Sequence, residues 1–145
     1  MEKGLNRFKP NEIEEDTINQ TKAKRALEQF FGLDIETQDV MSYWDWLFYR
    51  EGSLVAIGEY RRRFVDHDCY ADFQFSKKKF DAMAAKSAQE GVPAYMFVEF
   101  DDIFVCVKIE GNPQTQTMRR NHEVRTEECV VIPRNAYMYT YQLEL

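Results

Sequence analysis

The sequence predicts an α/β protein in which a mixed β-sheet carries helices on both faces. Two segments repeat apolar residues at helical spacing, over roughly 17–31 and 77–90, and strand-like apolar runs lie between and after them. The second of these helices lies between the strand-like stretches 53–61 and 94–100. That order is typical of a crossover unit with two parallel strands, and it leaves the other face of the sheet for the first helix.

The first helix is predicted by an apolar stripe and by the residues that flank it. Gly32 supplies a stop at its end, and Asp16 or Thr17 could cap its start. The stripe consists of Ala23, Ala26, Leu27, Phe30 and Phe31. The second helix is predicted in the same way, with Ser76 as its N-cap and with Gly91 and Pro93 closing it.

The strands are predicted from short aromatic and aliphatic runs. Residues 43–49 and 53–61 flank a Gly-containing turn and should form a β-hairpin. The runs 94–100 and 103–109 are nearly continuous in apolar residues, which is typical of strands that are covered on both faces. Shorter strands are expected over 129–133 and 137–141, and a polar surface loop over 112–128.

Length and composition set limits on the class of protein. With 145 residues, of which 44% are apolar, the chain can bury one core. We expect a flexible N-terminal arm over 1–16 and a single domain over 17–145. The net charge of −6 argues against a surface coated in DNA-binding charge, and any basic site must be confined to one face.

No membrane or secretion signal stands out in the sequence. The N-terminus lacks an apolar signal core, and no segment is long and uncharged enough to span a bilayer. We therefore expect a cytoplasmic protein without a membrane partner. Its cysteines, Cys69, Cys106 and Cys129, form neither a disulfide framework nor a CxxC zinc pair.

Two acids mark the predicted hairpin, Asp45 at the start of one strand and Glu59 near the end of the next. If the hairpin closes with a three-residue loop, Asp45 lies directly opposite Glu59. If Glu51-Gly52 forms a two-residue turn, Asp45 faces Gly58 and Glu59 points to the other side. The sequence alone leaves both registers open.

In the first register the two carboxylates favour a divalent metal site. Buried carboxylates are costly unless they are paired, neutralised or bound to a cation. Asp45, Glu59 and the main-chain carbonyl of Tyr60 offer the hard oxygen ligands that Mg²⁺ or Mn²⁺ accepts. The alternative is that Asp45 lies at a solvated strand end and that Glu59 pairs with Arg61 or Arg62.

The hairpin and its surrounding elements resemble the PD-(D/E)xK superfamily of nucleases, which has the restriction-endonuclease-like fold. The resemblance runs from about Thr17 to Ile109, and the stretch from Tyr43 to Ile132 is similar to small nuclease-like proteins of bacteriophages. It implies that Asp45 and Glu59 are the metal ligands, with Mg²⁺ or Mn²⁺ as cofactor, and that the protein is a phosphodiester hydrolase acting on DNA. A phage protein would act in the cytoplasm of the host cell.

The chain departs from this family at Arg61, which occupies the position of the usual lysine. Arginine holds a phosphate but stays protonated and cannot serve as a general base. The resemblance implies a replacement lysine from the second helix, for which Lys79 is the first candidate. Residues expected to contact nucleic acid are Arg61, Arg63, Gln74, Lys77 and Lys78. Glu28, the candidate for a further acid on the first helix, is left out of the core site.

Two functions therefore remain open. The first is a metal-dependent DNA nuclease in which Asp45, Glu59, Arg61 and Lys79 are catalytic, with the form of the DNA unspecified. The alternative is a catalytically inactive nuclease-fold module that binds nucleic acid or a protein partner. A stripe of Tyr137, Tyr139 and Tyr141 near the C-terminus predicts edge-strand packing or a self-association surface, so a homo-oligomer is possible.

Overall fold

The computed structural model of the chain describes residues 10–39, 41–119 and 126–145. These residues form two α-helices, nine β-strands and two short 3-10 helices. In chain order the elements are α2 (Pro10–Phe31), β1 (Asp34–Thr37), β2 (Trp46–Arg50), β3 (Ser53–Arg62), β4 (Asp72–Ser76), α3 (Lys77–Glu90), β5 (Ala94–Glu99), β6 (Phe104–Lys108), β7 (Thr115–Arg119), β8 (Thr126–Pro133), η1 (Arg134–Ala136), β9 (Met138–Tyr139) and η2 (Thr140–Gln142).

The strands form two sheets. Sheet A has six strands in the order β1-β2-β3-β5-β6-β9, and sheet B has three in the order β4-β8-β7. Strands β3 and β5 are parallel, as the crossover unit predicts, and the other pairs in sheet A are antiparallel. The predicted mixed sheet is therefore confirmed. The separate sheet B was not predicted.

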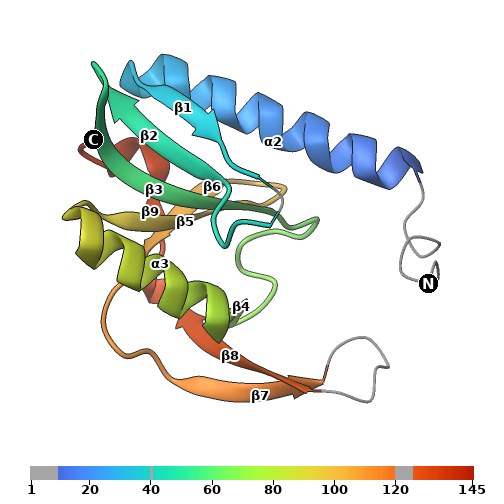
Figure 1. Cartoon of the computed structure of the whole chain (residues 1–145). Coiled ribbons are helices and arrows are strands. Elements are labelled where there is room, and N and C mark those ends of the chain that lie inside the picture. Colours follow the sequence, from blue (N-terminus) through green and yellow to red (C-terminus); the bar gives the residue numbers. More distant parts are fainter. Residues whose placement is uncertain (1–9, 40, 120–125) are drawn as a thin grey trace.

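Helices α2 and α3 lie on opposite faces of sheet A (Figure 1). On the α2 face, Leu27 belongs to a cluster with the buried rings of Trp46, Phe48 and Phe97. On the α3 face, Phe80 and Met83 pack with apolar residues of β3, β5, β6 and sheet B. Because both faces of sheet A are covered, the first five residues of β5 are all buried.

Helix α2 ends where predicted but begins earlier. Gly32 follows the helix with a φ of +66°, the left-handed conformation that a terminating glycine adopts readily. The predicted start at residue 17 is wrong, because the helix begins at Pro10 and Asp16 and Thr17 lie inside it. Proline suits the first helical position, and acids stabilise the following turns. Residues 10–16 of the expected arm are thus helical, and residues 1–9 lie outside the described chain.

Helix α3 spans Lys77–Glu90, which confirms the predicted bounds. Gly91 closes it with a φ of +68°, and the amide of Gly91 donates to the carbonyl of Ser87. Ser76 occupies the N-cap position, as predicted, but its side chain makes no capping hydrogen bond. Ser76 is also the last residue of β4, so helix and strand join directly. Among the residues that the structure describes, neither helix is long and apolar enough to cross a membrane.

Strands β1 and β7 escaped prediction because backbone pairing, rather than an apolar pattern, holds them in place. Strand β1 buries one residue of four, and β7 has the polar sequence TQTMR. Strand β7 pairs along its length with β8, which starts at Thr126, so much of the loop expected over 112–128 is strand. In contrast, the strand expected over 137–141 shrinks to Met138–Tyr139.

A substitution at Gly58 tests the packing between β2, β3 and β5. A Cβ on Gly58 would lie 2.8 Å from Cε1 of Phe48 and 2.9 Å from Cε2 of Phe97, and both rings are fully buried. We expect Gly58→Ala to lower the free energy of unfolding, measured in urea, by about 1–3 kcal/mol. In a double-mutant cycle, Phe48→Leu should relieve part of this cost. A cost that is the same in the Phe48→Leu background would contradict the clash.

Candidate functional site

The β2–β3 hairpin combines the turn of one predicted register with the strand pairing of the other. Glu51 and Gly52, with φ of 50° and 81°, form a two-residue turn, and Tyr49 pairs with Leu54. The register then shifts between Phe48 and Tyr49, so that Phe48 pairs with Ala56 and Trp46 with Gly58. This bulge sets one extra residue into β3. Continuing the same register places Asp45 opposite Glu59.

Asp45 is fixed to the edge of β3 by two hydrogen bonds. Its amide donates to the carbonyl of Gly58 at 3.1 Å, and its Oδ2 accepts from the amide of Tyr60 at 2.9 Å. Because the N–H and C=O of one strand residue point to the same side, the carbonyl of Tyr60 also points toward this edge. Strand β2 begins only at Trp46, which leaves that edge beside Asp45 available to a ligand.

Glu59 is buried on the α3 side of sheet A, with only 3% of its surface exposed. Its Oε2 accepts a hydrogen bond from Nζ of Lys79 at 2.8 Å, and Nη2 of Arg61 lies 3.7 Å from the same oxygen. Lys79 lies in the first turn of α3, four residues before the buried Met83, so it faces the sheet. The lysine singled out on the second helix therefore reaches the acidic pair.

Burial raises the pKa of the Glu59 carboxyl to about 7, from an ordinary value of 4.5. Removal from water is the largest cause, and the nearby charge of Asp45 adds to it, whereas Lys79 and Arg61 act in the opposite direction. The two cations thus do not fully offset the cost of the buried acid. A cation placed between the two carboxylates would favour the ionised form of Glu59 and so offset the effects of burial and of Asp45.

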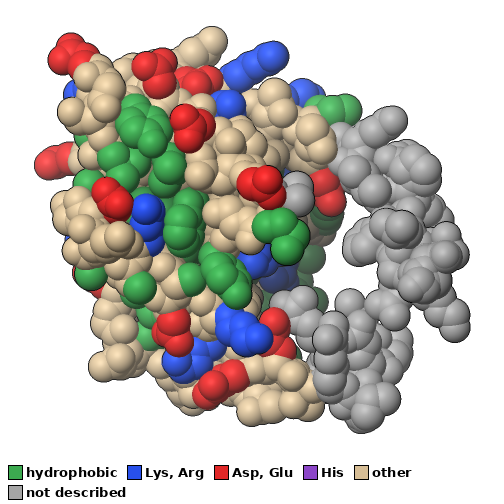
Figure 2. Space-filling model, in the orientation of Figure 1, with side chains coloured by type: hydrophobic (Ala, Val, Ile, Leu, Met, Phe, Trp, Pro, Cys, Tyr) green, Lys and Arg blue, Asp and Glu red, His purple; other side chains and the backbone are tan. Residues whose placement is uncertain are grey.

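The acids open into a polar cavity of about 380 Å³ at the edge of sheet A. Residues from both faces of the sheet line it, because the cavity lies where β2 has not yet begun. Its lining residues are Asp16, Gln20, Asp45, Glu59, Tyr60, Arg61, Arg62 and Lys79. On the molecular face shown in Figure 2, acidic and basic side chains are interspersed and form no broad basic patch.

Comparison with known proteins decides the family. A family model described as "Phage putative PDDEXK endonuclease" matches residues 7–128. The chain belongs to this family. The matched stretch contains the hairpin with Asp45 and Glu59, and it contains α3 with Lys79. The predicted membership of the PD-(D/E)xK superfamily is thereby confirmed.

Solved structures confirm the fold of this PDDEXK endonuclease-family protein. Hjc of Archaeoglobus fulgidus, a Holliday junction resolvase from an archaeal hyperthermophile, superposes with a TM-score of 0.58 at 11% sequence identity. The match covers 83% of this chain and 85% of Hjc. At that identity the likeness establishes the restriction-endonuclease-like fold, as predicted. No match was found among curated proteins.

Three residues of the cavity were not predicted as site residues: Arg62 of β3, and Asp16 and Gln20, which lie on α2. Asp16 and Gln20 line the cavity beside the acids of the hairpin. Asp16 was overlooked because it was taken for a helix cap, whereas a helix that starts at Pro10 places it inside α2, one turn before Gln20. Glu28, the acid considered earlier on this helix, instead accepts a hydrogen bond from the amide of Ile35 at 3.0 Å. The hydrogen bond to Ile35 is consistent with leaving Glu28 out of the predicted metal site.

The other residues expected to contact nucleic acid lie outside the cavity. The guanidinium of Arg63 lies over the ring of Phe73, 5.2 Å from its centroid. Gln74 lies on β4 between the buried Phe73 and Phe75, so it points to the opposite face of sheet B. Lys77 pairs with Asp81 at 2.6 Å, and Lys78 is exposed. Of the five residues expected to contact nucleic acid, the structure therefore places only Arg61 next to Glu59.

The donor set fits a small divalent cation. Within the part of the chain that the structure describes, no group of three or more His, Cys, Asp or Glu side chains is arranged to hold a metal. However, Mg²⁺ is commonly bound by one or two carboxylates, with water and substrate phosphate completing its shell. Asp45, Glu59 and the Tyr60 carbonyl meet that requirement, and the raised pKa of Glu59 shows that its buried carboxylate is costly to ionise without a further cation.

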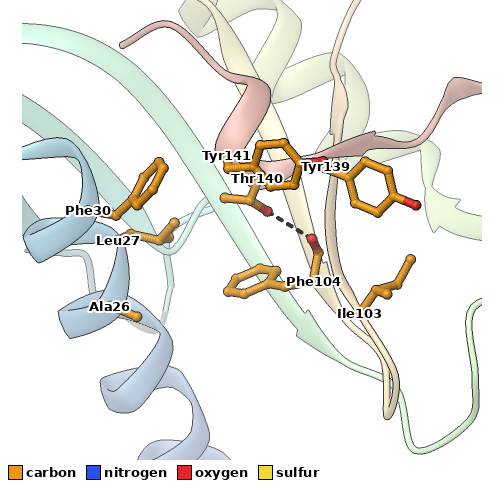
Figure 3. A pocket seen from close by; sticks show the side chains of 8 residues that line it. All are labelled: Ala26, Leu27, Phe30, Ile103, Phe104, Tyr139, Thr140 and Tyr141. Atoms are coloured by element: carbon orange, nitrogen blue, oxygen red, sulfur yellow. Dashed lines mark hydrogen bonds between the residues drawn. The ribbon is translucent and has the colours of Figure 1, made fainter.

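A second cavity, of about 530 Å³, is apolar and lies toward the other end of α2. Phe30 and Leu27 of α2 face Tyr139 and Tyr141 across it, and the hydroxyl of Thr140 donates to the carbonyl of Phe104 at 3.2 Å (Figure 3). The three tyrosines do not form one stripe. Tyr139 and Tyr141 stack with their ring centroids 5.4 Å apart, whereas the ring of Tyr137 packs on Phe100. Self-association through this end stays a prediction.

Proposed function

We propose that this protein is a divalent-metal-dependent DNA nuclease with its active site in the cavity around Asp45 and Glu59. One observation carries the proposal: the bulged hairpin sets two carboxylates side by side at an open sheet edge, with Lys79 at 2.8 Å from the buried one. Paired acids with a lysine are the components that the PD-(D/E)xK resemblance requires. Here the lysine comes from α3 and not from β3.

Asp45, Glu59 and the carbonyl of Tyr60 are the residues that would hold Mg²⁺ or Mn²⁺. When bound, such a cation neutralises charge that develops on the phosphate and lowers the pKa of water. Asp45 is held for this role by the Tyr60 amide, which donates a hydrogen bond to its Oδ2. The carboxylate of Glu59 is oriented by Lys79, with Arg61 also close to the same oxygen.

In this proposal Lys79 and Arg61 together perform the functions of the lysine that is usual in the family. The ammonium of Lys79 is a compact charge with three donors, and it is placed to orient the attacking water or to stabilise charge on the scissile phosphate. Arg61, whose side chain is 40% exposed, is placed to hold a phosphate oxygen at the mouth of the cavity. A general base at the position of Arg61 is excluded by its permanent charge.

The substrate that we propose is DNA, and branched DNA is included among the forms to test because Hjc is described as a Holliday junction resolvase. A phage nuclease would act in the cytoplasm of its host. The test is incubation with linear, nicked and branched DNA at pH 8, with Mg²⁺ or Mn²⁺ and in parallel with EDTA. We expect cutting that requires the metal and that disappears in Asp45→Asn combined with Glu59→Gln. Cutting in EDTA, or cutting by the double variant, would refute the proposed site.

A second candidate function is an inactive nuclease-fold module that binds DNA or a protein. The ion pair between Lys79 and Glu59 favours it, because an ammonium already occupies the oxygen that a metal would need. The variant Arg61→Lys separates the two candidates. If wild type leaves every DNA form intact and Arg61→Lys cuts, the protein is a nuclease whose activity has been lost at that position.

A further inference from the structure

The polar side of α2 forms a groove with β1 that adjoins the proposed active site. This α2 groove has a volume of about 240 Å³, and the residues that matter for its chemistry are Gln20, Thr21, Lys24, Arg25, Glu28 and Thr37. Gln20 lines both the α2 groove and the cavity with Asp45 and Glu59. The groove therefore leads away from the acids along the helix.

Two cations of the α2 groove, Lys24 and Arg25, form no close ion pair with an acid in the described part of the chain. Nζ of Lys24 donates to Oγ1 of Thr37 at 3.0 Å, which holds the ammonium against β1. Across residues 10–39, 41–119 and 126–145, neither Lys24 nor Arg25 takes part in an ion pair. The acid of the groove, Glu28, is engaged by the amide of Ile35.

We propose that the α2 groove binds the sugar-phosphate backbone of the DNA substrate on one side of the scissile phosphate. This inference rests on the proposed nuclease function. Lysine, arginine, threonine and glutamine are the residue types that contact phosphate oxygens in protein–DNA complexes. From Gln20 to Lys24 the helix rises about 6 Å, and the phosphates of one strand follow each other about every 3.4 Å along the duplex axis. The groove thus spans about two phosphates.

Such contacts position DNA without reading its sequence. The α2 groove accordingly predicts binding that is independent of base sequence and strongly dependent on salt. The groove meets the cavity at Gln20. A DNA strand whose phosphates are bound by Lys24 and Arg25 would therefore continue into the cavity with Asp45 and Glu59, and one particular phosphate would lie next to the two acids. The role assigned to Lys24 and Arg25 is therefore positioning of the substrate.

The test is the salt dependence of DNA binding, measured by fluorescence anisotropy of a labelled duplex in EDTA. Lys24→Gln with Arg25→Gln removes both cations, and Lys22→Gln with Lys108→Gln is the matched control. Lys22 is exposed on the same helix and Lys108 on β6, and neither lines either cavity. We expect the slope of log Kd against log salt to fall by about two in the groove variant, and affinity to fall about tenfold near physiological salt. The control should change little.

Equal slopes for the groove variant and the control would overturn the proposal, and so would a wild type that binds no DNA. If Lys24→Gln disturbs folding through Thr37, Arg25→Gln alone should still lower the slope by about one. Binding in EDTA does not depend on cutting. A groove effect together with cutting that survives in the Asp45 and Glu59 variants would refute the active site and leave the α2 groove in place.

Discussion

Replacing Lys79 with methionine is expected to lower the rate of DNA cutting by a factor of about 10² to 10³, the usual cost of removing one preorganised charge from a transition state. Methionine keeps the length of the stem and removes the ammonium that lies 2.8 Å from Oε2 of Glu59. The fold should survive, because Glu59 loses a partner but can remain neutral at its buried position. Initial rates on one DNA substrate with saturating metal measure the effect.

Two controls show which cation replaces the family lysine. Arg61→Met should cost less, about tenfold, because its guanidinium is 3.7 Å from Glu59 and is partly exposed. Lys77→Met removes a charge from the same turn of α3, where Lys77 pairs with Asp81, and should leave the rate unchanged. If instead Arg61→Met is the severe variant and Lys79→Met is harmless, Arg61 carries the role that we assign to Lys79.

The buried Glu59 should make the metal-free protein less stable as the pH rises from about 4.5 to 7. The pKa of Glu59 is about 7 when folded and near its ordinary 4.5 when unfolded. Between these values the folded protein holds a proton that the unfolded chain releases, so stability falls with rising pH. At 1.36 kcal/mol per pH unit, the free energy of unfolding should fall by about 3 kcal/mol in total and level off above the folded pKa.

The measurement is urea unfolding in EDTA at several values between pH 4.5 and 8, for wild type and for Glu59→Gln. Glutamine cannot ionise. The unfolding free energy of wild type minus that of Glu59→Gln should therefore fall as the pH rises from about 4.5 to 7 and then level off. Titrating groups that do not interact with Glu59 cancel in this difference. A difference that is constant across the range would mean that Glu59 keeps an ordinary pKa and is better solvated than the structure shows.

The sequence predicted the elements around the site better than it predicted the geometry that joins them. Apolar runs and glycine stops are local signals, and they located α3, the hairpin and the crossover to β5. The bulge between Phe48 and Tyr49 carries no local signal, yet it decides that Asp45 faces Glu59. It is set by how the β2 and β3 side chains pack on the two cores, which is a property of the whole sheet.

The remaining errors also concern features for which the sequence carries little local signal. Lys79 was proposed because the family resemblance implies a lysine from the second helix and Lys79 lies near the start of that helix. Asp16 was missed because residues 1–16 were taken for an arm, with Asp16 as a possible cap of the following helix, although Pro10 within that stretch is compatible with a helix start. Strands β1 and β7 have little apolar pattern of their own, and they form because β2 and β8 offer them backbone partners.

The central claim is that Asp45 and Glu59 together hold a divalent cation. Calorimetric titration with Mn²⁺ at pH 8, where Glu59 is mostly ionised, tests this claim on wild type and on Asp45→Asn combined with Glu59→Gln. We expect saturable heat in wild type, affinity that weakens as the pH falls below 7 because protons compete for Glu59, and no binding heat in the double variant. Absence of heat in wild type, or equal heat in both proteins, would contradict the account.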